Sequence, residues 1–176
     1  VDMLSLPGIE MSTGSLGQGL SAANGMALAA KMDKRDSRIY CLLGDGECQE
    51  GQVWEAAMTS SHHKLDNLTA IIDHNKYQID GRIEEIKSLA PFADKWKAFG
   101  WSVSICDGHN VKSIIEALEK AEKIKGKPSM IIADTIKGKG VSFMEEKPLD
   151  YHGKAPTPEE EKKAIAELCQ LKDLKS

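Results

Sequence analysis

The chain has 176 residues, enough for one domain whose folding buries roughly 70% of the surface that the unfolded chain exposes. Its 41% hydrophobic and 28% charged residues exclude the disordered and fibrous classes. Its net charge is -4, and its basic residues do not form a stripe that would attract a nucleic acid. No apolar run reaches the ~20 residues that cross a bilayer, and the residues after Val1 show no signal-peptide pattern. We therefore expect a cytoplasmic protein that binds neither nucleic acid nor membranes.

Strands and helices are expected to alternate along the chain. A glycine-rich turn at Gly14 leads into a helix that ends near Lys31. The apolar run from Arg38 to Leu43, bounded by Gly44, is typical of a strand buried on both faces. The later elements are helices near 52–63, 92–99 and 111–124 and strands near 69–73, 102–106 and 129–133. This order predicts an α/β fold, a doubly wound parallel sheet with helices on both faces.

The last part of the chain breaks this alternation. Residues 135–157 are rich in Gly, Lys and Pro and predict a long loop, either a functional active-site loop or a mobile one. A helix is expected over 158–171, because acidic residues in its first turn interact favourably with the helix dipole. We interpret residues 1–176 as a single domain.

Two groups of residues that often carry chemistry are interpreted as structural. The cysteines are far apart, with no C-x-x-C pair, and are expected to be reduced thiols: Cys41, Cys48, Cys106 and Cys169. The histidines without a functional sequence context are His62, His63 and His109. Neither group predicts a metal or redox site.

Two expected strands end in side chains that suit a hydrated metal. Asp45 follows the first strand and Asn75 the second, and the carboxyl ends of parallel strands meet at one edge of the sheet. Mg²⁺ prefers oxygen ligands at about 2.1 Å and often shares them with phosphates. Gly44 and Gly46 flank Asp45, as a close approach of the backbone to a diphosphate requires. Gly-Asp-Gly alone also marks ordinary turns, but Asn75 one βα unit later favours a magnesium diphosphate site.

A wider set of motifs resembles a known family. Four stretches stand in transketolase order along nearly the whole chain: Gly14-Ser-Leu-Gly-Gln-Gly19, Gly44-Asp-Gly-Glu-Cys-Gln-Glu-Gly-Gln52, Asp73-His-Asn-Lys-Tyr-Gln-Ile-Asp-Gly81 and His152-Gly153. The chain therefore resembles the N-terminal, diphosphate-binding domain of transketolases, or the N-terminal subunit of a split transketolase.

The resemblance implies the cofactor thiamine diphosphate with Mg²⁺, or with Ca²⁺ or Mn²⁺ in its place. It assigns the metal to Asp45, Asn75 and the main-chain carbonyl of Tyr77. The other cofactor-binding positions are Gly14 and Leu16 at the aminopyrimidine, Gly44 and Gly46 at the diphosphate, Ile79 and Ile136 around the rings, Lys137 near the diphosphate, and Glu50 at the subunit interface. His152, near the diphosphate and the donor substrate, is the candidate catalytic residue.

Some of these positions have a structural alternative. Leu16, Ile79 and Ile136 are also consistent with core residues. Lys137 is also consistent with a solvated loop lysine, and its Gly-Lys-Gly context lacks the Ser or Thr of a P-loop.

The family resemblance implies an activity that we do not expect this chain to carry out alone. Transketolases transfer a two-carbon ketol unit from a ketose phosphate to an aldose phosphate, with the hard chemistry supplied by the cofactor. In the family a separate pyrimidine-binding domain activates the cofactor, and we expect no counterpart of it within these 176 residues. We therefore expect a separate C-terminal transketolase subunit with a pyrimidine domain, in a hetero-oligomer of two copies of each.

Two alternatives remain open, and a third is disfavoured. One is another thiamine-diphosphate enzyme, of the deoxyxylulose-phosphate synthase or dehydrogenase E1 type. A second is a non-catalytic assembly fragment that kept the fold after losing the segment that precedes these motifs in the family. Since that segment is not in this sequence, we expect the chain to be either a shortened natural variant or part of a longer product. A nicotinamide-binding domain is not favoured, because no G-x-G-x-x-G follows a strand.

Overall fold

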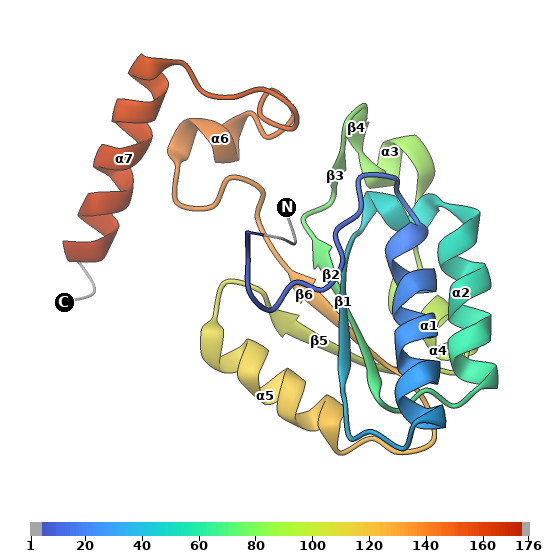
Figure 1. Cartoon of the computed structure of the whole chain (residues 1–176). Coiled ribbons are helices and arrows are strands. Elements are labelled where there is room, and N and C mark those ends of the chain that lie inside the picture. The colour runs from blue at the N-terminus through green and yellow to red at the C-terminus, as the bar shows by residue number, and fades with distance from the viewer. Residues whose placement is uncertain (1–4, 174–176) are drawn as a thin grey trace.

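The central sheet contains four parallel strands (Figure 1). The structure is a computed structural model that describes residues 5–173. The strands, in their order across the sheet, are β1 (Ile39–Gly44), β2 (Leu68–His74), β6 (Ser129–Asp134) and β5 (Ser102–Asp107). Every neighbouring pair is parallel and in continuous register. The predicted parallel α/β sheet is confirmed.

Helices cover both faces of this sheet (Figure 1). On one face lie α1 (Gln18–Met32), α2 (Gly51–His62) and α4 (Phe92–Ala98), and on the other lies α5 (Val111–Glu122). The larger core fills the first face, where the Trp54 ring contacts Trp96 at a centroid distance of 4.9 Å and Phe99 at 5.0 Å. The sheet is therefore covered on both sides, as a doubly wound fold requires.

α1 begins at a glycine turn and packs closely on the sheet. Gly17, its N-terminal capping residue, has a φ of 84°, a left-handed conformation that favours glycine. Leu20, Ala23 and Ala27 recur at helical spacing and are buried against the sheet. Small side chains on this stripe let the helix approach the strands closely.

The prediction that β1 is buried on both faces is wrong. Cys41 and Leu43 point into the larger core, but Tyr40 is 47% exposed and Leu42 is 73% exposed. The reason is that α5 packs mainly on β5 and β6. It reaches β1 through its last residue, where the Tyr40 hydroxyl donates to Glu122 at 3.2 Å. β1 also lies at the edge of the sheet in this part of the chain.

Several short elements were not predicted. They are a 3-10 helix η1 (Gly46–Gln49), a hairpin of β3 (Tyr77–Gln78) and β4 (Gly81–Arg82), α3 (Ile83–Lys87) and α6 (Ser142–Glu146). α6 lies inside the segment 135–157, and α7 (Pro158–Asp173) follows it. Both stand away from the sheet (Figure 1), and Ser142 joins them by donating its N–H and its hydroxyl to Glu167. Among the described residues no helix is both long and apolar enough to cross a membrane.

Candidate cofactor and metal site

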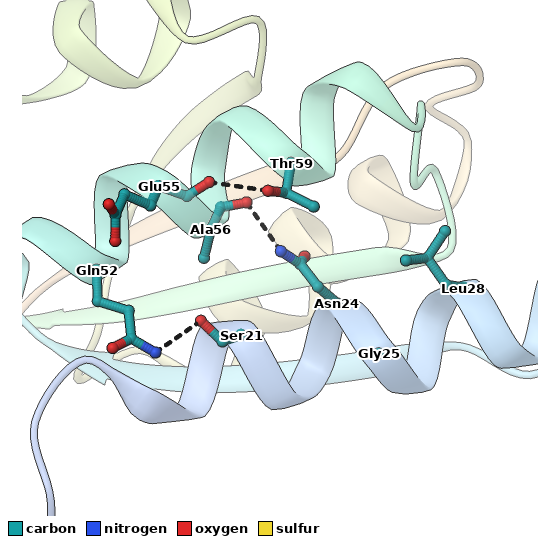
Figure 2. Close-up of a pocket in the computed structure, with 8 residues that line it drawn as sticks. All are labelled: Ser21, Asn24, Gly25, Leu28, Gln52, Glu55, Ala56 and Thr59. Carbon is teal, nitrogen blue, oxygen red and sulfur yellow. Dashed lines mark hydrogen bonds between the residues drawn. The ribbon is translucent and has the colours of Figure 1, made fainter.

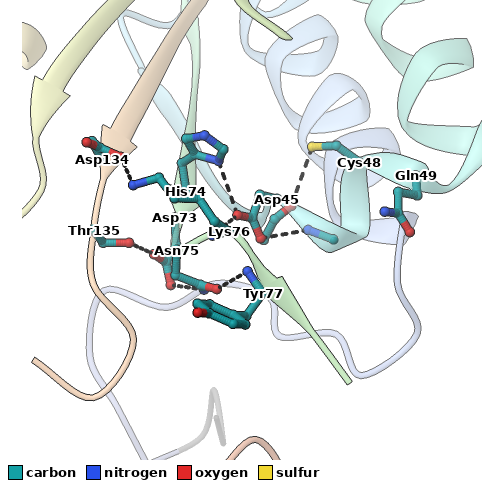
Figure 3. A network of polar contacts seen from close by, with 12 residues as sticks. Asp45, Cys48, Gln49, Asp73, His74, Asn75, Lys76, Tyr77, Asp134 and Thr135 are labelled. Carbon is teal, nitrogen blue, oxygen red and sulfur yellow. Dashed lines mark hydrogen bonds and ion pairs between the residues drawn. The ribbon is translucent and has the colours of Figure 1, made fainter. Parts of the chain in front are cut away.

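Polar side chains gather where three strands end at the same edge of the sheet (Figure 3). Gly44 pairs with Asp73, and His74 pairs with Asp134, so the carboxyl ends of β1, β2 and β6 lie side by side. Ligands of open parallel sheets bind beyond this edge. The two strands whose ends were predicted to carry metal ligands are therefore neighbours.

Asp45 is held rigidly at this edge. Its side chain is almost completely buried, at 1% exposure for the residue. Oδ1 accepts the N–H of Gly46 at 2.8 Å, Oδ2 accepts the N–H of Lys76 at 2.6 Å, and Oδ2 also lies 3.1 Å from Nδ1 of His74. A buried carboxylate requires such partners, because an unpaired one is costly. Oδ1 keeps one acceptor position beyond its bond to Gly46.

Asn75 is held by a turn that follows β2. Its Oδ1 accepts the N–H of Tyr77 at 3.0 Å, and its Nδ2 donates to Oδ2 of Asp73 at 3.2 Å. Lys76, between Asn75 and Tyr77, has a φ of 72°, which is uncommon for a side chain other than glycine. The same left-handed turn brings the Lys76 N–H onto Asp45, so it links the two predicted metal ligands.

The donor set fits a magnesium ion that shares its ligands with a phosphate. Asp45 offers a carboxylate oxygen and Asn75 an amide oxygen, the hard ligands that Mg²⁺ prefers. Residues 5–173 contain no group of three or more His, Cys, Asp or Glu side chains that could hold a metal by themselves. A hydrated cation completed by phosphate oxygens fits these residues.

Glu47 joins two segments of the site, and the sequence analysis missed it. Its Oε2 accepts the N–H of Gly44 at 3.0 Å, and its Oε1 accepts the N–H of Gly17 at 2.9 Å. The carboxylate thus fixes the turn before α1 against the end of β1. The backbone N–H of Gly46 was expected to donate to the diphosphate, whereas in this structure it donates to Asp45. Its donation to a bound diphosphate stays a prediction.

The apolar candidates are on the surface. Leu16 is 59% exposed, Ile79 is 72% exposed and Ile136 is 46% exposed. The alternative interpretation of these residues as core is therefore wrong. Gly14 is also exposed, in the segment that leads to α1.

A cavity of about 340 Å³ lies at the ends of β2 and β6. Its lining comprises Asp73, Asn75, His109, Thr135, Ile136, Lys137 and Gly138. The structure thus brings together Asn75, Ile136 and Lys137 as predicted neighbours of one ligand. His109 was interpreted only as structural, yet it lines this cavity, and its Nε2 accepts the N–H of Ile136 at 2.8 Å. Its proximity depends on the pairing of β5 with β6, which no local motif reveals.

A second hollow, of about 390 Å³, lies between α1 and α2 (Figure 2). Asn24 points into it and donates Nδ2 to the carbonyl of Ala56 at 2.8 Å, and Gln52 donates Nε2 to the hydroxyl of Ser21 at 3.1 Å. Ser60 donates its hydroxyl to Oδ1 of Asn24 at 2.6 Å. None of the predicted site residues lines this hollow.

The two remaining candidates lie in different places. His152 is exposed in the loop between α6 and α7, and its pKa lies below the ordinary value because partial burial and then the positive charge of Lys137 disfavour the charged ring. Glu50 occupies the N-cap position of α2 without a side-chain hydrogen bond to that helix, and it is exposed. A Cβ added at Gly17 would lie 3.1 Å from the Cβ of Glu50, so Glu50 packs directly on the turn before α1.

The fold and this edge define an α/β protein of the kind that binds ligands beyond its strand ends. The sequence profile described as "Transketolase, thiamine diphosphate binding domain" matches residues 2–171, and the chain belongs to this family. The resemblance inferred from the motifs is confirmed.

Named relatives agree with this assignment. The 6-deoxy-6-sulfo-D-fructose transketolase subunit SqwG of Clostridium sp. (strain MSTE9) is 55% identical over 167 residues, which are 95% of this chain and 60% of the relative. An apulose-4-phosphate transketolase subunit from Phocaeicola vulgatus is 47% identical, over 95% of this chain and 59% of the relative. The transketolase of Campylobacter jejuni has a similar structure, with a TM-score of 0.84 and 35% identity over 94% of this chain and 27% of that chain. The chain therefore spans about 60% of the length of the two subunits it matches.

Proposed function

We propose that the chain forms the thiamine-diphosphate- and Mg²⁺-binding part of a transketolase. In this role it acts with a pyrimidine-domain partner to transfer a two-carbon ketol unit from a ketose phosphate to an aldose phosphate. Ca²⁺ or Mn²⁺ can replace Mg²⁺. The observation that carries the proposal is the hydrogen bond of 2.6 Å between the N–H of Lys76 and Asp45, because it holds the Asn75 turn against the Asp45 carboxylate.

Each candidate residue has a distinct task in this proposal. Asp45, Asn75 and the main-chain carbonyl of Tyr77 hold the metal, and Gly44 and Gly46 let the backbone approach the diphosphate. The other positions form the surroundings of the cofactor: Gly14 and Leu16 at the aminopyrimidine, Ile79 and Ile136 around the rings, and Lys137 at the diphosphate. When bound, thiamine diphosphate supplies the chemistry that cleaves and forms the carbon–carbon bond.

His152 is proposed to touch the donor substrate. Its lowered pKa keeps the imidazole neutral near physiological pH, so one ring nitrogen can accept a proton while the other donates a hydrogen bond. Lys137 contributes to that shift, and we propose that its charge also balances the diphosphate. His152 and Lys137 therefore belong to one site in this proposal, with the segment 135–157 as its loop.

Exposed apolar side chains on the chain support the proposal of a partner subunit. Leu16, Ile79 and Ile136 are exposed apolar side chains, and a cofactor ring packed on them would need a second surface to exclude water. Two relatives carry the word subunit in their names, which supports a separate partner chain. We propose a separate C-terminal subunit with a pyrimidine domain, two copies of each chain in the complex, and Glu50 at the interface.

Calorimetry on the purified complex of the chain with its partner tests the cofactor half of the proposal. We expect saturable binding of thiamine diphosphate with Mg²⁺, lost in EDTA and weakened more than about 100-fold by Asp45→Ala, since removing even an outer partner of a metal ligand costs 10- to 100-fold. Asp36→Ala, the same change at an exposed aspartate, serves as the control. Tight binding in EDTA, or unchanged activity after Asp45→Ala, would overturn the proposal.

The donor substrate needs a separate assay. The names of the relatives include a 6-deoxy-6-sulfofructose enzyme and an apulose-4-phosphate enzyme, and both names describe a sugar with an anionic group. Fructose 6-phosphate and 6-deoxy-6-sulfofructose should be compared as donors at equal concentration with the same aldose phosphate acceptor. Ketol transfer from either donor supports the transketolase assignment, whereas a complex that binds cofactor but transfers from neither donor, nor from apulose 4-phosphate, contradicts it.

A further inference from the structure

Asp73 makes two contacts that none of the assigned roles explains. Its Oδ1 accepts the hydroxyl of Thr135 in a short hydrogen bond, and its Oδ2 accepts Nδ2 of Asn75 at 3.2 Å (Figure 3). Across the described residues it forms no ion pair, since the nearby Lys76 ammonium pairs with Asp134 instead. The carboxylate is therefore satisfied by two neutral side chains on different strand ends.

The contact with Asn75 decides which end of that amide faces outward. Nδ2 is directed to Asp73, while Oδ1 accepts the N–H of Tyr77 at 3.0 Å. Rotating the amide by half a turn would set Oδ1 against the carboxylate and Nδ2 against an N–H, which makes two repulsive contacts. Without Asp73, only the Tyr77 contact would favour the orientation with the oxygen available to a ligand.

The contact with Thr135 ties this arrangement to the neighbouring strand. Thr135 follows β6, and its N–H donates to the carbonyl of His74 at 3.2 Å. Gly108 contacts the same strand end from the β5 side, where its N–H donates to the carbonyl of Asp134 at 2.9 Å. Asp73 thus connects Asn75 to a segment that is fixed from both sides.

We propose that Asp73 is a positioning residue that holds the Asn75 amide with its oxygen toward the metal and anchors it to Thr135. The identity of the metal rests on the proposed function, but the orientation of Asn75 does not. Asp73 acts through hydrogen-bond geometry, and its charge is not required.

This distinction between geometry and charge sets the variants. Asp73→Asn can keep both contacts, because its oxygen accepts from Asn75 and its NH₂ group donates to Thr135, whose hydroxyl can also accept. Asp73→Leu removes both contacts and keeps the branching at Cγ, although its two methyl groups are larger than the carboxylate oxygens. Thr135→Val removes only the anchor, and Thr135→Ser keeps it as the matched control.

The first measurement is the Mg²⁺ concentration that half-saturates thiamine diphosphate binding by the complex. We expect a rise of about 10- to 100-fold for Asp73→Leu, a smaller rise for Thr135→Val, and values close to wild type for Asp73→Asn and Thr135→Ser. An equal loss in Asp73→Asn and Asp73→Leu would overturn the proposal, because it would show that the charge matters. An unchanged Mg²⁺ dependence in Asp73→Leu would also overturn it, even if that variant melts at a lower temperature.

The second measurement needs neither cofactor nor partner. Hydrogen exchange of the Asn75 side-chain NH₂ group, followed by NMR in the full chain, should be slow in wild type and Asp73→Asn and faster in Asp73→Leu. If Asp73→Leu does not fold, Thr135→Val replaces it, and exchange of the Asn75 NH₂ group in Thr135→Val should be faster than in wild type. Identical exchange in all variants would overturn the proposal. If the wild-type complex binds no cofactor, the proposed function fails, and this measurement still decides whether Asp73 orients Asn75.

Discussion

The Glu47 carboxylate accepts the backbone N–H of Gly17 at 2.9 Å across thirty residues of sequence. Its other oxygen accepts the N–H of Gly44 at 3.0 Å, so one side chain fixes both the turn before α1 and the end of β1. Gly17 borders the predicted cofactor position Leu16, and Gly44 is itself a predicted cofactor position. Glu47 therefore supports the shape of the site without being one of its expected ligands.

Replacing Glu47 by Gln should destabilise the chain. The amide can keep one N–H contact through its oxygen, but its NH₂ group must face the other N–H. Hydrogen bonds to charged groups contribute about 1.5–3 kcal/mol each, so we expect a loss of about 2 kcal/mol in the free energy of unfolding, measured in urea. Glu119→Gln, the same change at an exposed position of α5, should have almost no effect; equal effects in the two variants would contradict the role of Glu47.

Gly108 should not tolerate even a methyl group. A Cβ at this position would overlap the Thr135 methyl and lie 3.1 Å from the carbonyl oxygen of Asp134. Overpacking of this kind costs about 1–3 kcal/mol, so Gly108→Ala should lower the melting temperature. Gly25→Ala is the matched control, because a Cβ there meets nothing within 4 Å and alanine in a helix interior is favoured by roughly 0.5–1 kcal/mol. A melting temperature for Gly108→Ala at or above wild type would contradict the close packing.

The pKa of His152 should respond to Lys137. Partial burial and the positive charge of Lys137 both lower it, so Lys137→Met should raise it toward the ordinary value without restoring it fully. NMR titration of the imidazole measures this, and Lys139→Met is the control because Lys139 pairs with Glu145. Because the folded pKa is lowered, the unfolded chain binds this proton more readily. Acidification below the ordinary pKa of His152 should therefore reduce the free energy of unfolding. A rise of the His152 pKa in Lys139→Met but not in Lys137→Met would contradict the role of Lys137.

The cysteines should differ sharply in reactivity. Burial, followed by the charge of Glu47, raises the pKa of Cys41 to about 12; burial also raises the pKa of Cys48 and Cys106, whereas Cys169 is exposed. Since the thiolate is the nucleophile, iodoacetamide at mildly alkaline pH should label only Cys169 in the native chain and all four thiols in urea. Mass spectrometry of the native Cys169→Ser variant should show no label, and rapid labelling of Cys41 there would contradict its burial.

Local patterns in the sequence were sufficient for much of this structure. An apolar run bounded by Gly44 predicted β1, helical spacing predicted α1, and the alternation that follows predicted the other main helices and strands near their observed ranges. Asp45 and Asn75 could be placed at one edge because parallel strands end on the same side of a sheet. These inferences depend only on periodicity and direction.

The residues that were missed depend on contacts between distant segments. Glu47 reaches Gly17, and His109 reaches Ile136, only because the folded strands bring those backbones together. The left-handed turn at Lys76 was also not predictable, since lysine has no preference for that conformation. The exposure of Leu42 depends on how far α5 extends over the sheet, which periodicity along one strand does not encode.

The exposed flank of β1 has a consequence for preparing the protein. Within residues 5–173 this strand has one neighbour, β2, and it presents Tyr40 and Leu42 to solvent. An edge strand with apolar side chains is a template onto which other extended chains can add, so the chain produced alone is expected to aggregate as its concentration rises. Charged substitutions at Leu42 offer a route to monodisperse samples, because they leave the carboxyl ends of the strands untouched.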